Sequence, residues 1–197
     1  MSLAYRIMYR VGFTPWDTDR VPTELSQLVE GPGALPAGRA LDLGCGTGTQ
    51  AVYLAGLGWR VTAIDALTRP LKRARARADR AGVRVDWILG DVARLWGLGV
   101  EPGFTLAFDR GCFHGLDEAR RAACAAAMTA LAAPGATLLM MAFAPHRIPA
   151  APAGIEESEI LGRFGGWQLI SARPDTEDEI TGPLRNVPRT WYRLVRA

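Results

Sequence analysis

Cysteine and histidine are scarce in this chain of 197 residues, and their scarcity excludes several kinds of site. The three cysteines, Cys45, Cys112 and Cys124, are odd in number and follow no CxxC spacing, so the sequence indicates neither a disulfide framework nor a zinc ribbon. His114 and His146 are the two histidines, and with so few nitrogen ligands we expect no metal site. A chain that does without disulfides suits a reducing compartment, so we expect a cytoplasmic protein.

Long apolar segments and a strong net charge are also missing. No run approaches the roughly 20 apolar residues that a membrane-spanning helix needs. The N-terminal segment interleaves Arg6 and Arg10 with apolar side chains, unlike a signal peptide, so we expect no membrane span. The net charge is only +3, and the arginines between Arg69 and Arg84 alternate with alanines along a predicted helix that lacks aromatic residues for stacking on bases. A nucleic-acid partner is therefore not favoured.

The remaining composition is that of an ordinary folded domain. Hydrophobic residues make up 49% of the chain and charged residues 22%, and the length suits one domain over residues 1–197. Short runs rich in Leu, Val and Ile alternate with Ala-rich helical patterns, as in βαβ units around a parallel sheet. The predicted strands are 40–43, 61–64, 83–89, 104–108, 136–144, 167–172 and 191–197, the predicted helices 49–57, 69–81 and 117–133, and the predicted connectors 145–154 and 173–188. Asp117 is the expected N-cap of the last helix, and Pro134 with Gly135 is expected to end it.

The strongest chemical signal is a glycine-rich turn between the first predicted strand and the first predicted helix. Gly44, Gly46 and Gly48 alternate there with Cys45 and Thr47. Glycine adopts positive φ and carries no Cβ, so the backbone turns tightly against a ligand, and the helix that follows offers free amides. The turn therefore predicts a nucleotide-like ligand.

Two details distinguish this turn from a dinucleotide site. The G-x-G-x-x-G pattern requires a glycine where Thr49 stands, because Gly48 comes one place early. Asp42, two residues before the first glycine, would repel a pyrophosphate but could hold the ammonium group of an amino acid. An NAD(P)-dependent oxidoreductase is therefore the alternative function and not the favoured one.

Acidic residues end further predicted strands. Asp65 lies about 20 residues beyond the glycines, the separation at which a carboxylate meets ribose hydroxyls. Asp91 follows the third predicted strand and Asp109 the fourth. An aspartate at such a position, taken alone, is more often a helix cap or a turn residue than a ligand-binding one. Ligands of open α/β sheets bind outside the carboxyl ends of the strands, so these residues and Asp42 should face one crevice.

From Leu41 to Gly48 the chain resembles, residue for residue, the first motif of the class I S-adenosylmethionine-dependent methyltransferases. The resemblance implies a Rossmann-like seven-stranded, mostly parallel sheet with helices on both faces and an antiparallel C-terminal strand. It also implies S-adenosylmethionine as methyl donor and S-adenosylhomocysteine as product, with Asp65 on the ribose and Asp91 on the adenine amino group. The cofactor-binding residues that it implies are Trp16, Asp42, Gly44, Cys45, Gly46, Thr47, Gly48, Asp65, Ala66, Asp91, Val92 and Asp109.

The acceptor side resembles the thiopurine and tellurite-resistance branch of small-molecule methyltransferases. Residues 108–116 hold an Asp-Arg-Gly stretch that ends in His-x-Leu, residues 14–17 lie upstream, and the Asp/Asn-Pro-Pro-aromatic motif of base-amine methyltransferases is absent. We expect a small-molecule acceptor reacting at sulfur, oxygen or a similar soft atom, with a nucleic-acid methyltransferase as a further alternative. The candidate catalytic residues are Asp109, His114 and Asp17, and either of the last two could take a proton from a hydroxyl acceptor. A packed or solvent-facing residue at a helix start is the alternative for His114.

The N-terminal segment and Trp96 each allow two interpretations, and Cys45 is expected to have no catalytic role. Residues 1–35 form either a helical lid over donor and acceptor, as the resemblance implies, or a helix docked on the sheet. Trp96 either packs on the adenine or belongs to the core. Cys45 is expected to be a small loop residue and not a nucleophile, because nothing nearby in the sequence would lower its pKa. The oligomeric state has no signal in the sequence.

Overall fold

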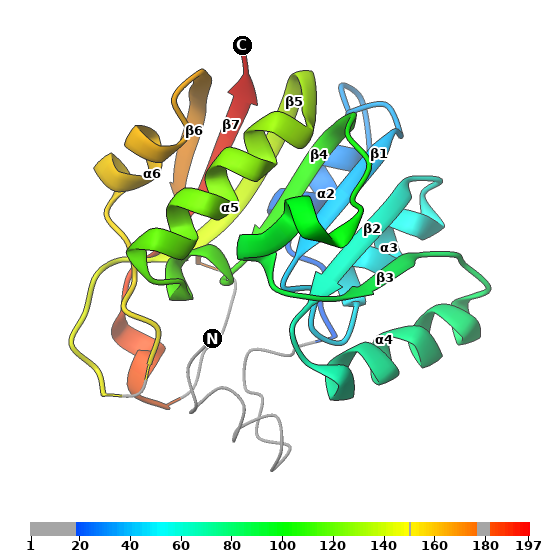
Figure 1. Cartoon of the computed structure of the whole chain (residues 1–197), viewed down its shortest axis with the longest axis horizontal. Coiled ribbons are helices and arrows are strands. Elements are labelled where there is room, and N and C mark those ends of the chain that lie inside the picture. The colour runs from blue at the N-terminus through cyan, green and yellow to red at the C-terminus, as the bar shows by residue number, and fades with distance from the viewer. Residues whose placement is uncertain (1–18, 150, 177–181) are drawn as a thin grey trace.

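Seven strands form one sheet in the computed structural model, which describes residues 19–149, 151–176 and 182–197 (Figure 1). The strands are β1 (Arg39–Leu43), β2 (Arg60–Asp65), β3 (Asp86–Leu89), β4 (Phe104–Arg110), β5 (Ala132–Phe143), β6 (Trp167–Pro174) and β7 (Arg189–Arg196). Their order across the sheet is β3-β2-β1-β4-β5-β7-β6. Strand β7 pairs antiparallel with β5 and β6, whereas the pairings from β3 to β5 are parallel. The Rossmann-like fold class, with its antiparallel C-terminal strand, is therefore confirmed.

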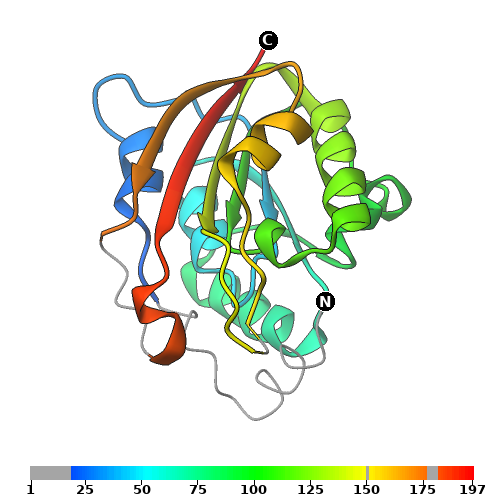
Figure 2. The ribbon, with the colours of Figure 1, turned by 90° about the vertical axis from the view of Figure 1, so that its left-hand side faces the viewer.

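Helices cover both faces of this sheet. They are α2 (Thr23–Val29), α3 (Thr49–Gly56), α4 (Thr68–Ala81), α5 (Glu118–Leu131) and α6 (Glu157–Arg163), with short 3₁₀ segments η1 (Val92–Leu98), η2 (Phe113–Gly115) and η3 (Gly182–Asn186). Figure 1 shows α5 and α6 in front of the sheet and α2 and α3 behind it, and Figure 2 shows the sheet between the two layers. Leu41 and Leu43 of β1 belong to the buried cluster that includes α5, and Ala40 to the cluster that includes α2 and α3. A strand covered on both faces is apolar throughout, which is why the central strands are readable as continuous apolar runs.

Several element boundaries differ from the sequence-based prediction, and two of the differences have a clear local cause. The third strand begins at Asp86 and not at residue 83, because Gly82 in the left-handed conformation closes α4 and the Val83 amide still donates to the Ala78 carbonyl. Helix α5 ends at Leu131, two residues before the predicted end, and β5 begins at once. Proline disfavours the helical conformation at the residue before it, so the chain becomes extended ahead of Pro134.

Five short helical segments were not predicted individually. Helix α6 lies after the expected connector, η3 lies inside the expected loop 173–188, and α2 lies inside the segment 1–35. The other two are η1 and η2, which follow β3 and β4. Leu25, Leu28 and Val29 of α2 are buried with the sheet, so this part of the segment is docked. Residues 1–18 of the predicted lid lie outside the described residues. Within the ranges 19–149, 151–176 and 182–197, no helix is long and apolar enough to cross a membrane.

A buried arginine, Arg121, connects α5 to α6 and to the chain near residue 154. Arg121 of α5 is 7% exposed, and its Nη1 donates to Glu159 Oε2 of α6 at 3.0 Å. Its Nη2 donates to the carbonyl oxygens of His114 at 2.6 Å and Gly154 at 2.7 Å. A buried guanidinium is costly unless it is hydrogen-bonded, and these acceptors stabilise it. The same contacts hold α6 and the chain near residue 154 against α5.

Replacing Arg121 tests this bracing role. The substitution Arg121→Met should lower the free energy of unfolding by about 2–4 kcal/mol, because it leaves buried carbonyl oxygens without their donor. Urea titration followed by circular dichroism measures the effect. The exposed Arg73 of α4 is the matched control, and Arg73→Met should change stability by less than about 0.5 kcal/mol. Equal effects of the two substitutions would contradict the role given to Arg121.

Candidate active site

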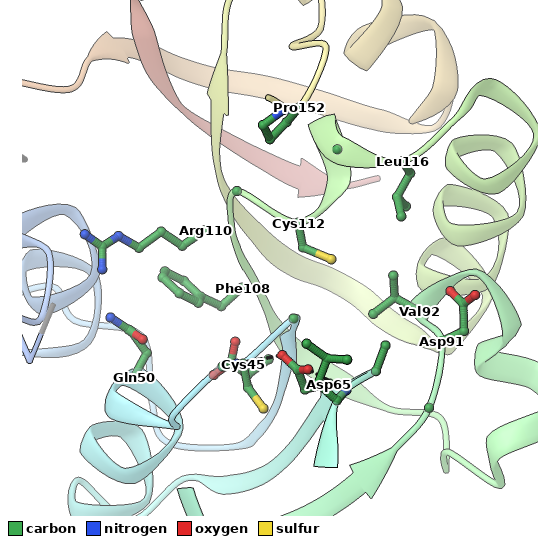
Figure 3. A pocket seen from close by; sticks show the side chains of 18 of the residues that line it. Cys45, Gln50, Asp65, Asp91, Val92, Phe108, Arg110, Cys112, Leu116 and Pro152 are labelled. Atoms are coloured by element: carbon green, nitrogen blue, oxygen red, sulfur yellow. Dashed lines mark hydrogen bonds between the residues drawn. The ribbon is translucent and has the colours of Figure 1, made fainter. Parts of the chain in front are cut away.

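A cavity of about 220 Å³ opens at the carboxyl ends of β1, β2, β3 and β4 (Figure 3). Loops that follow these four strands form most of it, and residues 151–153 reach it from the connector after β5. The described residues that line it are Asp42, Gly44, Cys45, Gly46, Thr47, Thr49, Gln50, Asp65, Ala66, Leu67, Gly90, Asp91, Val92, Phe108, Arg110, Gly111, Cys112, Gly115, Leu116, Arg120, Ala151, Pro152 and Ala153. The crevice expected from the strand ends is therefore present, with three of the four acidic residues in its lining.

The glycine-rich turn forms one wall of the cavity. Gly44, Gly46 and Gly48 all have positive φ, at 68°, 55° and 78°. The Gly46 amide donates to Asp65 Oδ2 at 3.0 Å, so the end of β2 holds the turn after β1. A Cβ on Gly44 would lie 2.7 Å from the Cβ of Cys112, so only glycine fits between these strand ends.

Gly48 does not line the cavity, although the resemblance assigned it to the cofactor. A Cβ on Gly48 would lie 2.6 Å from the Trp87 ring and 2.8 Å from Ala74. Its surroundings are therefore strand β3 and helix α4. The absence of a side chain at Gly48 lets α3 start close to both elements, which is a packing role.

Asp42 is the most unusual group in the cavity wall. It is 2% exposed, and its Oδ2 is buried with no hydrogen-bond partner among the described residues. Burial, together with the charges of Asp109 and Asp65, raises the pKa of Asp42 to about 8. A ligand that brings a positive charge or a hydrogen-bond donor would stabilise this buried carboxyl group.

Asp65 and Asp91 are held by donors from neighbouring elements. The Leu67 amide donates to Asp65 Oδ1 at 2.8 Å, which adds to the bond from the glycine turn. Asp91 caps η1 by accepting from the Ala93 amide at 3.0 Å, and Arg120 Nη2 lies 2.7 Å from both of its carboxylate oxygens. Partial burial opposes ionisation of Asp91, but the hydrogen bond from Arg120 outweighs it and lowers the pKa of this carboxyl. Both carboxylates line the cavity, with their positions set by these donors.

Asp109 does not lie in the cavity lining. It is 1% exposed, and it accepts from the amides of Gly111 and Cys112 at 3.1 Å and of Phe113 at 3.0 Å. Burial raises the pKa of Asp109 to about 7, although these amides favour the charged form. Asp109 therefore stabilises the turn after β4 by accepting hydrogen bonds from its backbone amides. This geometry does not support the direct contact with donor or acceptor that was expected.

His114 also lies outside the lining and is packed in the interior. It is 1% exposed, its Nδ1 accepts from the Phe143 amide at 3.3 Å, and its ring makes an edge contact with the ring of Phe143. Burial and the nearby charge of Arg121 lower the pKa of His114 to about 3. A neutral, packed imidazole is the alternative given above for this residue, and the structure does not support His114 as a proton acceptor. Trp16 and Asp17 lie outside the described residues.

The remaining sequence expectations concern cysteines, Trp96 and metals. Cys45 and Cys112 line the cavity, and burial raises the pKa of both thiols, so neither is an activated nucleophile. Trp96 is 66% exposed and absent from the lining, which excludes both of its expected roles in this conformation. No group of three or more His, Cys, Asp or Glu residues with metal-binding geometry occurs in the part of the chain that the structure describes.

Several lining residues were missed by the sequence analysis. Gln50 and Arg110 lie on one side of the cavity in Figure 3, and Asp91 lies on the other. Arg120 reaches the cavity from α5, and Pro152 reaches it from the connector. Gln50, Arg120 and Pro152 belong to no motif. Arg110 had a signal, because it belongs to the Asp-Arg-Gly stretch at the end of β4.

Known proteins resemble this chain in sequence and in structure. A family described as a methyltransferase domain matches residues 40–135. The chain is 30% identical over 138 residues to a probable thiol methyltransferase 2 from Arabidopsis thaliana, a match covering 68% of this chain and 59% of that protein. A solved structure from work on the conversion of a disulfide bond into a thioacetal group during echinomycin biosynthesis is 26% identical, with a TM-score of 0.73 and coverage of 100% of this chain and 93% of the other. A 1,6-didemethyltoxoflavin-N1-methyltransferase from Burkholderia thailandensis, solved with 1,6-didemethyltoxoflavin and S-adenosylhomocysteine bound, is 22% identical, with a TM-score of 0.76 and coverage of 98% and 85%.

The curated relatives are longer than the segments they share with this chain. The chain spans 59% of the Arabidopsis protein, and 27% and 26% of two others, a Talaromyces variabilis protein and a Methylocella silvestris protein.

Substitution at Gly44 tests the geometry of the cavity wall. Gly44→Ala should lower the free energy of unfolding by about 2–4 kcal/mol, because it combines a disfavoured positive φ with a clash against Cys112. Gly56 of α3 has open space where a methyl group would lie, so Gly56→Ala should leave stability unchanged or raise it by up to about 1 kcal/mol. Thermal and urea denaturation of both variants measure the difference, and a harmless Gly44→Ala would refute the close approach.

Proposed function

The chain belongs to the class I S-adenosylmethionine-dependent methyltransferases, and from this premise we propose that it transfers a methyl group to a small molecule with a soft nucleophilic atom. S-adenosylmethionine is the cofactor of this enzyme class, and its sulfonium supplies the methyl group. The observation that carries the proposal is the buried, unpartnered Oδ2 of Asp42 beside a glycine-rich turn. An amino-acid ammonium group is the cation that a methionine moiety would bring there.

The other acidic strand ends suit the rest of the donor. Ribose hydroxyls would donate to Asp65, with Ala66 alongside, and the adenine amino group would donate to Asp91. The amide of Val92 is a candidate for a ring nitrogen, and the Val92 and Leu116 side chains give that end of the cavity apolar walls for a flat base. A dinucleotide fits less well, because its pyrophosphate would face the carboxyl groups of Asp42 and Asp65.

The acceptor would lie beyond the donor, toward Phe108, Arg110 and residues 151–153. Methyl transfer from a sulfonium is an in-line displacement, so the protein mainly aligns donor and acceptor and excludes water. His114 is neutral and outside the lining, so an acceptor that ionises unaided suits this site best. A thiol, with an ordinary pKa of about 8.5, meets that requirement better than an alcohol. The similarity to a probable thiol methyltransferase supports the same choice.

Binding and turnover test this proposal directly. The protein should bind S-adenosylhomocysteine with a dissociation constant on the order of micromolar by calorimetry. It should also methylate an aromatic thiol at least about tenfold faster than the phenol with the same ring, because a larger fraction of the thiol is ionised. Mass spectrometry of the products with labelled S-adenosylmethionine gives both rates. A protein that neither binds S-adenosylhomocysteine nor methylates either acceptor would refute the function.

The proton on Asp42 gives a second prediction. The unliganded carboxyl is protonated below about pH 8, whereas an ammonium ligand favours its ionised form, so binding releases a proton below that pH. The affinity for S-adenosylhomocysteine should therefore rise from pH 6 to pH 8, by at most about tenfold per pH unit. Asp42→Asn should lower affinity at pH 8 by at least about tenfold and flatten this dependence.

Asp42→Asn, which should lower the affinity for S-adenosylhomocysteine, should raise the stability of the unliganded protein. A carboxyl whose folded pKa is raised favours the folded state only while it is protonated, so its contribution is lost as pH rises from about 4 to about 8. Asp42→Asn should therefore stabilise the unliganded protein at neutral pH. Asp86 on β3 is exposed and outside the cavity, and Asp86→Asn should leave both measurements unchanged. An Asp42→Asn variant that keeps full affinity and the pH slope would contradict the assignment.

A further inference from the structure

Arg120 contacts a carboxylate of the cavity wall. It lies in the first turn of α5, where its backbone amide donates to the N-cap side chain of Asp117 at 3.0 Å. Its side chain crosses to η1, where Nη2 lies 2.7 Å from both carboxylate oxygens of Asp91. The helix cap therefore fixes the backbone of Arg120, and the Arg120 side chain reaches the cavity from there.

The neighbouring arginine shows that this placement is specific. Arg121 turns toward α6 and is buried against Glu159, whereas Arg120 keeps 24% of its side chain exposed and lines the cavity. The Asp91 side chain is 35% exposed, so the pair is not sealed from a ligand. Arg120 therefore contacts the N-cap of η1, whereas Arg121 contacts α6.

The hydrogen bonds leave Asp91 with a defined remaining capacity. An ionised carboxylate offers about four lone-pair positions. The Ala93 amide and Arg120 use both available positions on Oδ1, and Arg120 uses one on Oδ2. Among the described residues no donor uses the second position on Oδ2, and the direction of that position is set by the donors on the others.

We propose that Arg120 is a positioning residue that holds the Asp91 carboxylate in one orientation, so that the donor site selects a 6-aminopurine over a 6-oxopurine. This inference rests on the proposed function, in which Asp91 faces the adenine. A 6-amino group donates to the remaining lone pair of Asp91. A 6-oxo group places an acceptor oxygen against an acceptor, and a site built around one polar partner strongly rejects an analogue that leaves it unpaired.

The test compares two ligands that differ at this position. S-adenosylhomocysteine and S-inosylhomocysteine carry an amino group and an oxo group, respectively, and calorimetry gives the ratio of their dissociation constants. The wild-type protein should prefer S-adenosylhomocysteine by at least about tenfold. In Arg120→Met this preference should shrink by about fivefold or more, because the Asp91 carboxylate is then no longer held in one orientation and can turn away from the oxo group.

Arg94 provides the matched control. It lies in η1, three residues after Asp91, is exposed and is absent from the cavity lining, so Arg94→Met removes the same charge near Asp91 without removing a contact to its carboxylate. The ligand preference of Arg94→Met should stay within about twofold of the wild type. If Arg120 had only a structural role, Arg120→Met would weaken the binding of both ligands by the same factor. The ratio of their dissociation constants would then stay unchanged.

The outcomes separate this inference from the function it rests on. Binding of S-adenosylhomocysteine by the wild type with an unchanged ratio in Arg120→Met overturns the inference alone, whereas a wild type that binds neither ligand overturns both. If Arg120→Met does not fold, Asp91→Asn is the second variant, since an amide can donate to the 6-oxo group and should reduce the preference as well. A full preference in Asp91→Asn would also overturn the inference.

Discussion

Burying a carboxyl group without a partner is unfavourable, and this protein buries one near the end of β1. Asp42 Oδ2 has no hydrogen-bond partner among the described residues, and the nearby charges of Asp109 and Asp65 oppose ionisation of Asp42. The surrounding structure keeps this arrangement in place. Asp65 holds the glycine turn, and Asp109 is neutralised in part by three amides. The cavity is therefore organised around a position that favours a cationic ligand, and the unliganded state gives up stability to maintain it.

Much of the fold followed from local sequence patterns. The strands near 40–43, 61–64 and 104–108 were recognisable because both faces of the sheet are covered and the apolar runs are uninterrupted. Helix α6 was missed because it is only a short helix, and its position depends on tertiary contacts such as that between Arg121 and Glu159. The end of α5 was misplaced because the effect of Pro134 extends to the residue before it.

The candidate site was predictable where its chemistry lies in contiguous motifs. The turn at 44–48 and the acidic ends of successive strands placed Asp42, Asp65 and Asp91 around one cavity. Roles that depend on three-dimensional packing were not predictable. Asp109 and His114 end a strand and follow it, as acceptor-facing residues would, yet the chain turns both into the interior. Arg120 sits in an ordinary helical pattern, and only the approach of α5 to η1 brings it to Asp91.

A crystal structure with S-adenosylhomocysteine bound tests the central claim most directly. The claim predicts the ligand ammonium nitrogen within about 3.2 Å of Asp42 Oδ2, the ribose diol on Asp65 and the base at Asp91. Electron density that places the ligand outside this cavity, or with its ammonium group away from Asp42, would contradict it.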